Sequence, residues 1–200
     1  MDKRGMVFEV RIHGRGGQGV VSAAELLADA AFREGRHAQA FPSFGSERTG
    51  APVVAFCRIS DREIRLREPV MHPDALIIQD PTLLHQVDLF SGVPPGAYIL
   101  INSTLGFADL GLGDFIKDFD PRRLCTVPAT DLALRHVGRP VPNVPLLGGF
   151  AAISGMMHLA SVISAIRDKF PPKVAAANIA AASEAFDGVI KSLALESFHA

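Results

Sequence analysis

The sequence has little that could hold a metal ion or form a disulfide framework. It contains only two cysteines, Cys57 and Cys125, and neither lies in a C-x-x-C pair. The seven histidines are scattered, without the H-x-x-x-H or H-E-x-x-H spacing that places two imidazoles on one helix face. We therefore expect this chain to hold no metal ion and no iron–sulfur cluster, and we expect both thiols to be buried and free.

The sequence also lacks an excess of one charge and a long apolar run. Lysine and arginine number 20 against 21 aspartates and glutamates, so the formal net charge is −1 and a nucleic-acid partner is not expected. No apolar run reaches the roughly 20 residues that span a bilayer, and the N-terminal MDKRGMVFEV has no apolar signal region. These features predict a cytoplasmic protein without a membrane partner, and the length favours a single domain over residues 1–200.

What is present is a repeated alternation of strand and helix patterns. Residues 7–13 alternate apolar and polar side chains as a strand does, and residues 20–35 have helical spacing and end on Gly35. A hairpin is predicted from residues 52–60 and 62–66. Further short apolar runs predict strands at 37–41, 74–80, 97–103 and 123–129.

The last third of the chain is helical in pattern. Residues 148–170 and 173–195 both show helical spacing, and a Pro-Pro pair separates them. Together with the preceding elements they predict an α/β fold: a Rossmann-like, doubly wound, mostly parallel sheet with an added β-hairpin and C-terminal helices.

A glycine-rich turn, HGRGGQGVV (13–21), joins the first strand to the first helix. Gly14, Gly16 and Gly19 fit G-x-G-x-x-G in the required context, so backbone N–H groups at the helix N-terminus can meet a phosphate. A dinucleotide site also needs an acidic residue about 20 positions further on, where this chain reads HAQAFPSF. Its absence weakens the dinucleotide interpretation. Close packing of helix on strand, with no ligand at all, remains the alternative.

Two further features bear on recognition. Gln18 adds a neutral donor and acceptor beside the turn. In the segment AFPSFGSERTGAPVVAFCRIS (40–60), one acid and one base, Glu47 and Arg48, lie in a glycine-flanked loop. Functional loops have this composition, and so do ordinary turns.

These two motifs, in this order, resemble the gamma subunit or gamma domain of the 2-oxoacid:ferredoxin oxidoreductases, of which pyruvate:ferredoxin oxidoreductase (pyruvate synthase) is a member. The resemblance includes PDALIIQDPTLL, AYILINST, VPNVPLLGGFAA and KVAAANIAAASEAFDGV, and so extends over nearly the whole chain. The forms ERTGAP and RISD are more similar to the pyruvate-type branch than to the 2-oxoglutarate-type branch.

The resemblance implies a division of labour among subunits. Alpha and beta subunits would hold thiamine diphosphate and Mg, a delta subunit would hold the iron–sulfur clusters, and ferredoxin would accept the electrons released when a 2-oxoacid is converted to an acyl-CoA. The gamma subunit would not be catalytic alone and would help to bind coenzyme A near the active site. The implied ligand-binding residues are Gly14, Gly16, Gly17, Gln18, Gly19, Glu47, Arg48 and Asn143.

Individual roles follow from side-chain chemistry. Arg48 offers a planar fork of donors to a phosphate or carboxylate, and Glu47 would orient it, although a salt bridge without a ligand is the alternative. Asn143 would contact the ligand or cap the following helix. Three functional alternatives stay open: a subunit of an aryl-glyoxylate or branched-chain 2-oxoacid dehydrogenase, a purely structural subunit, and a free-standing nucleotide-binding protein.

Overall fold

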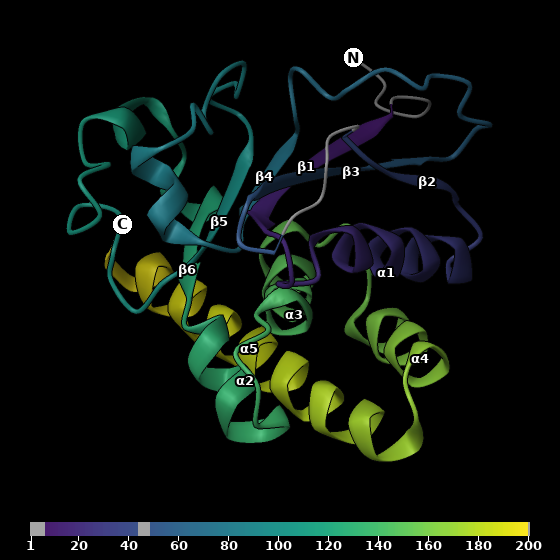
Figure 1. Ribbon diagram of the computed structural model, residues 1–200. Coiled ribbons are helices and arrows are strands. Elements are labelled where there is room, and N and C mark those ends of the chain that lie inside the picture. The colour runs from purple at the N-terminus through teal and green to yellow at the C-terminus, as the bar shows by residue number, and fades with distance from the viewer. Residues whose placement is uncertain (1–6, 44–48, 200) are drawn as a thin grey trace.

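The computed structural model describes residues 7–43 and 49–199. In this part of the chain, strands form one six-stranded sheet in the order β2-β3-β1-β4-β5-β6 (Figure 1). Parallel pairing joins β1 to β4, β4 to β5 and β5 to β6. Strand β3 runs antiparallel to both β1 and β2. The strands are β1 (Phe8–Arg15), β2 (His37–Pro42), β3 (Pro52–Ser60), β4 (Ala75–Ile78), β5 (Tyr98–Asn102) and β6 (Leu124–Val127).

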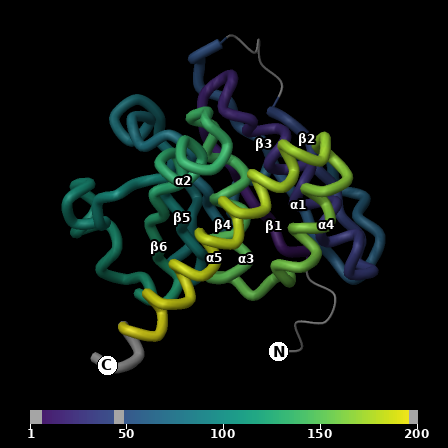
Figure 2. The backbone as a smooth tube through the Cα atoms, turned by 90° about the horizontal axis from the view of Figure 1, so that it is seen from below, coloured from purple at the N-terminus to yellow at the C-terminus, as the bar shows by residue number. Residues whose placement is uncertain are grey.

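The α-helices of the described residues cover one face of this sheet (Figure 1). Seen from below, α5 runs diagonally across the helical layer, where it packs against α2, α3 and α4 (Figure 2). A Cβ on Gly148 of α3 would lie 2.0 Å from the carbonyl oxygen of Ala182 in α5, so this close crossing requires glycine. The helices are α1 (Val20–Arg33), α2 (Ala129–Val137), α3 (Asn143–Ser154), α4 (Leu159–Lys169) and α5 (Pro172–His199).

Short 3₁₀ helices and loops pack on the opposite face. Leu76 and Ile78 of β4 point away from the α-helices and pack with Leu83 and Leu89 in a second apolar cluster. Burial on both faces explains why β4 and β5 are continuous apolar runs in the sequence. The 3₁₀ helices are η1 (Pro81–His85), η2 (Phe115–Asp118) and η3 (Pro121–Arg123).

The structure confirms the α/β class, the mostly parallel sheet and the C-terminal helices. The predicted hairpin is wrong in its second strand: residues 52–60 form β3, but residues 62–66 are irregular. Both edges of β3 are already paired, with β1 and β2, so no edge is left for another strand. The strand that precedes β3 in the sequence, β2, pairs antiparallel with it instead.

The helix predicted over 148–170 is two helices. α3 begins earlier, at Asn143, and ends at Ser154 because Gly155 adopts a left-handed conformation with φ 59°. α4 then begins at Leu159. The second predicted C-terminal helix is confirmed as α5.

Two charged or titratable residues of β1 are buried on the face opposite the α-helices. Arg11 donates from Nη2 to the carbonyl oxygens of Leu89 (2.9 Å) and Ser91 (2.8 Å), so its charge is held by backbone dipoles. His13 is 6% exposed, and its Nε2 has no hydrogen-bond partner in the described part of the chain. Burial, and secondarily the charge of Arg11, lowers the pKa of His13 to about 4.

This shift makes the stability of the protein pH-dependent. A histidine in the unfolded chain has a pKa of about 6.5, so below that pH the unfolded state takes up a proton that folded His13 resists. The free energy of unfolding therefore falls as the pH decreases from about 6.5 towards 4, by about 3 kcal/mol in total from this residue. Urea unfolding across this range measures it, and NMR titration of the His13 ring gives the folded pKa directly.

The substitution His13→Gln should remove this part of the pH dependence. The matched change His85→Gln, at an exposed histidine in η1, should leave it in place. A folded His13 pKa near 6.5 by NMR would contradict the prediction.

Candidate functional site

The β1–α1 turn lies where open α/β sheets place their ligands. From β1 the chain proceeds to β2 and β3 on one side, while β4, β5 and β6 extend on the other, so the strand order reverses between β1 and β4. Ligands bind outside the carboxyl ends of the strands at such a switch point. The predicted glycine motif is therefore at the expected place.

The glycines of the motif serve different purposes. Gly14 lies within β1, where a Cβ would be 2.6 Å from Cγ2 of Val20, so its role is to let α1 pack across the strand. Gly17 has φ 94° and faces open space. Gly19 has φ 72° at the N-cap of α1, and a Cβ there would lie 2.4 Å from Nδ2 of Asn143. Gly14 is thus a packing residue, and Gly17 is the glycine with free space above it.

Both polar atoms of the Gln18 amide are bonded within the protein. Its Oε1 accepts a hydrogen bond from the backbone N–H of Arg15 (2.8 Å), and its Nε2 donates to Oδ2 of Asp80 (2.8 Å). Asn143 behaves similarly, since its Nδ2 donates to the carbonyl oxygen of Gly19 (3.3 Å). Both predicted ligand residues therefore brace the turn in this structure.

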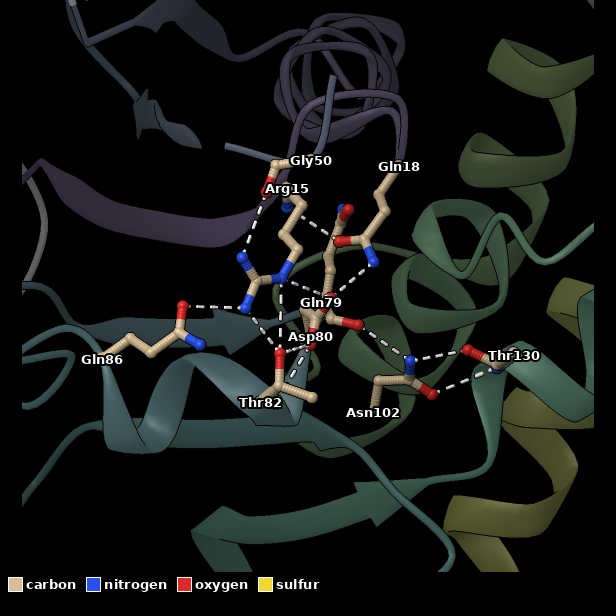
Figure 3. Close-up of polar contacts among 9 residues, drawn as sticks. All are labelled: Arg15, Gln18, Gly50, Gln79, Asp80, Thr82, Gln86, Asn102 and Thr130. Atoms are coloured by element: carbon tan, nitrogen blue, oxygen red, sulfur yellow. Dashed lines mark hydrogen bonds and ion pairs between the residues drawn. The ribbon is translucent and has the colours of Figure 1, made fainter. Parts of the chain in front are cut away.

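Arg15 and Asp80, which sequence reasoning missed, connect the turn to η1 (Figure 3). Nε of Arg15 lies 3.1 Å from Oδ2 of Asp80, and the same oxygen accepts from Gln18. Burial alone would raise the pKa of Asp80, but hydrogen bonds from Thr82 and Gln18 and the charge of Arg15 hold that pKa below its ordinary value. The available signal was the run Asp80-Pro81-Thr82 at a strand end, which begins a 3₁₀ helix capped by the aspartate.

A second polar contact joins the ends of β4 and β5 to α2. Nδ2 of Asn102 donates to the carbonyl oxygen of Gln79 and to Oγ1 of Thr130, each at 2.8 Å (Figure 3). Oδ1 of Asn102 accepts from the backbone N–H of Thr130 (3.1 Å). Asn102 therefore fixes the start of α2 through both polar atoms of its amide.

The N-terminus of α1 is open. The first backbone hydrogen bond of the helix runs from Ala23 N–H to Gly19 O, and no side chain of the described residues caps the earlier N–H groups. No acidic side chain lies in the first turn, residues 20–23. These groups border a depression of about 300 Å³, lined by Arg15, Gly16, Gly17, Gly19, Val20, Val21, Ser22 and Val53.

The structure brings the second sequence motif to the glycine turn. Gly16 N–H donates to Ala51 O (2.9 Å) and Gly50 N–H donates to Gly16 O (3.0 Å), and Thr49 pairs with Gly16 as an isolated parallel bridge. Glu47 and Arg48 lie outside the described residues, so their contacts stay predictions. Their neighbour Thr49, however, is at the turn.

The strand arrangement argues against a dinucleotide. In a dinucleotide site, the strand beside β1 ends in an acidic residue that holds the ribose. Here that neighbour is β3, which runs antiparallel and places its first residue, Pro52, opposite Arg15. β2 is one strand further out and ends in Phe41 and Pro42.

A metal cluster and a membrane-spanning helix are both absent over residues 7–43 and 49–199. No group of three or more His, Cys, Asp or Glu side chains within these ranges is placed to hold a metal ion. Within the same ranges no helix is long and apolar enough to cross a membrane. Both cysteines are buried, and burial raises the pKa of Cys57 to about 12.

This chain is similar to known proteins over nearly its full length. Residues 9–188 match the family model for pyruvate ferredoxin/flavodoxin oxidoreductase. The common gamma subunit of the pyruvate/ketoisovalerate oxidoreductases of Thermococcus litoralis is 42% identical over 184 residues, which cover 92% of this chain and 98% of the relative. The crystal structure of pyruvate oxidoreductase subunit PORC from Thermotoga maritima is 35% identical with a TM-score of 0.76, covering 90% of this chain and 96% of that one.

A more distant structure shares the fold. It is the 2-oxoglutarate:ferredoxin oxidoreductase of Magnetococcus marinus with 2-oxoglutarate, coenzyme A and succinyl-CoA bound. Its identity to this chain is 22% and the TM-score is 0.62, covering 98% of this chain and 32% of the longer one.

Fold and site define a Rossmann-like α/β subunit with an open helix N-terminus at its glycine turn. The chain belongs to the pyruvate ferredoxin/flavodoxin oxidoreductase family, as a gamma subunit of a 2-oxoacid:ferredoxin oxidoreductase. It is thus one component of a multi-subunit oxidoreductase.

The bracing role of Gln18 can be tested with a matched pair of substitutions. Gln18→Glu replaces the donor to Asp80 with a second carboxylate 2.8 Å away, which should lower the free energy of unfolding by about 1–3 kcal/mol at pH 7. Gln86→Glu keeps an acceptor for Nη2 of Arg15 and should change stability by no more than about 0.5 kcal/mol. Urea unfolding measures both; an equal loss in the two variants would contradict the bracing role.

Proposed function

We propose that this gamma subunit binds part of coenzyme A at its glycine turn, within a complex that oxidatively decarboxylates a pyruvate-type 2-oxoacid to an acyl-CoA. The partner alpha and beta subunits hold thiamine diphosphate and Mg, the delta subunit holds the iron–sulfur clusters, and ferredoxin accepts the electrons. The complex works in the cytoplasm, and residues 1–200 form one domain of it. The proposal rests on the open N-terminus of α1, which lies beside the segment that follows Arg48.

A phosphate of coenzyme A suits this helix end. Val20, Val21 and Ser22, whose N–H groups lack a side-chain cap, line the depression, and the helix dipole favours negative charge there. Even a Cβ added to Gly17 would have no neighbour within 4 Å, so a ligand has room to approach the backbone at this residue.

The turn itself supplies no free positive charge. Arg15 is paired with Asp80, and among the described residues no basic side chain other than Arg15 lines the depression. On this proposal the charge comes from Arg48, whose planar guanidinium contacts a phosphate while Glu47 orients it. Gly16 positions Thr49, the residue after Arg48, against the turn.

The size of the depression supports a shared site. About 300 Å³ lies at the lower end of the roughly 300–1,000 Å³ that small-molecule sites occupy, so it fits one part of coenzyme A. Partner subunits would enclose the remainder. The fold neighbour that was solved with coenzyme A is likewise a longer protein than this chain.

Ser22 offers a substitution that separates ligand binding from folding. Ser22→Asp places a carboxylate in the first turn of α1, where the helix dipole stabilises it by about 0.3–1 kcal/mol, so the thermal midpoint should stay the same or rise. The same carboxylate repels a phosphate, and KM for coenzyme A in the assembled complex should rise by about tenfold or more. CoA-dependent 2-oxoacid oxidation and thermal unfolding measure the two effects.

Ser22→Asn is the matched control, because it has the same shape without the charge and should leave KM for coenzyme A near its original value. If Ser22→Asp leaves this KM unchanged in an intact complex, coenzyme A does not bind at the α1 N-terminus and the subunit has a structural role.

A further inference from the structure

The side chain of Arg15 donates hydrogen bonds to groups of four other residues. Nη1 donates to the carbonyl oxygen of Gly50 (3.0 Å), and Nη2 donates to Oγ1 of Thr82 (2.7 Å) and Oε1 of Gln86 (2.9 Å). Nε donates to Oδ2 of Asp80 (3.1 Å). All three guanidinium nitrogens are therefore committed to groups of the protein (Figure 3).

These contacts join three segments that are far apart in the sequence. Arg15 itself ends β1 and begins the glycine turn, Gly50 belongs to the segment 49–51, and the remaining partners belong to η1 and its flanks. Figure 3 shows the guanidinium between Gly50 on one side and Thr82 and Gln86 on the other. A lysine, with a single nitrogen, cannot reach both sides at once.

The contact with Gly50 affects the shape of the depression. The segment 49–51 is otherwise attached to the turn by the backbone pairing with Gly16, and it leads directly into Val53, which lines the depression together with Ser22. Val53 itself is held opposite Gly14 by the pairing of β1 with β3, and the bond from Arg15 to Gly50 holds the segment 49–51 beside Gly16 at the edge of the depression.

The charge of Arg15 is offset where it stands. Asp80 accepts from both Arg15 and Gln18, and Gln18 accepts in turn from the backbone N–H of Arg15, so the three residues form a closed ring of hydrogen bonds. The charge of Arg15 is therefore compensated within the protein, although its side chain lies at the rim of the depression.

We propose that Arg15 is a positioning residue for ligand binding: it ties the segment 49–51 to η1 and thereby sets the width of the site between that segment and the α1 N-terminus. The inference rests on the proposed function for the identity of the ligand. Arg15 acts through Gly50: the charge-assisted hydrogen bond from Arg15 to the carbonyl oxygen of Gly50 is the contact that positions the segment 49–51.

The test is Arg15→Lys in this chain of the assembled complex. Lysine retains the ion pair with Asp80 but gives up the bond to Gly50, so KM for coenzyme A should rise about tenfold while kcat and the CoA-independent decarboxylation of the 2-oxoacid change less than about twofold. Amide hydrogen exchange of the segment 49–53 should become faster in the same variant.

Arg33→Lys is the matched control. Arg33 also joins separate elements, through bonds to Ser164 and Asp168, but it lies at the far end of α1. The substitution Arg33→Lys should leave KM for coenzyme A and the hydrogen exchange of the segment 49–53 unchanged.

The outcomes separate this inference from the proposed function. If Ser22→Asp raises KM for coenzyme A and Arg15→Lys changes neither KM nor the exchange of segment 49–53, Arg15 is not a positioning residue although the ligand site stands. If Arg15→Lys speeds exchange while neither variant changes KM, the contact is structural, and both the inference and the coenzyme A site are overturned. Equal losses of kcat and of decarboxylation in Arg15→Lys would indicate failed assembly and would also contradict the positioning role of Arg15.

Discussion

The carboxylate of Asp80 is the acceptor on which the glycine turn depends. It lies at the end of β4 and receives hydrogen bonds from Arg15 and Gln18, which are the two long polar side chains of the turn. Because the pKa of Asp80 is held below its ordinary value, the acceptor is charged at neutral pH. Asp80 thereby holds in place the two side chains that brace the turn, and one of them, Arg15, also bonds the carbonyl oxygen of Gly50.

The topology distinguishes this Rossmann-like turn from the turn of a dinucleotide site. Insertion of antiparallel β3 beside β1 removes the acidic strand end that would hold a ribose, and it brings the segment 49–51 against Gly16 instead. The helix N-terminus stays available for a phosphate. The topology therefore keeps the exposed helix N-terminus of a Rossmann-like turn and places a second loop motif beside it.

Much of the fold could be predicted because local pattern determines it. β1 and α1 follow from alternation and helical spacing, and the buried strands β4 and β5 follow from short apolar runs bounded by turns. The pairing of β3 could not be predicted in the same way, since residues 52–60 are equally suited to several neighbours. Only the availability of edges in the assembled sheet excluded residues 62–66 as a partner.

By itself, the sequence determined the α/β class, the place of the glycine turn and the absence of an acid where a dinucleotide needs one, because each of these depends on residues close together in the chain. Only the tertiary structure decided what the polar side chains of the turn do. Gln18 bonds to Asp80 across 62 positions and Asn143 bonds to Gly19 across 124, so both side chains brace the turn, and their ligand contacts stay predictions. A side-chain amide donates equally well to a ligand or to the protein, and the choice is made by which acceptor the fold places within hydrogen-bond distance.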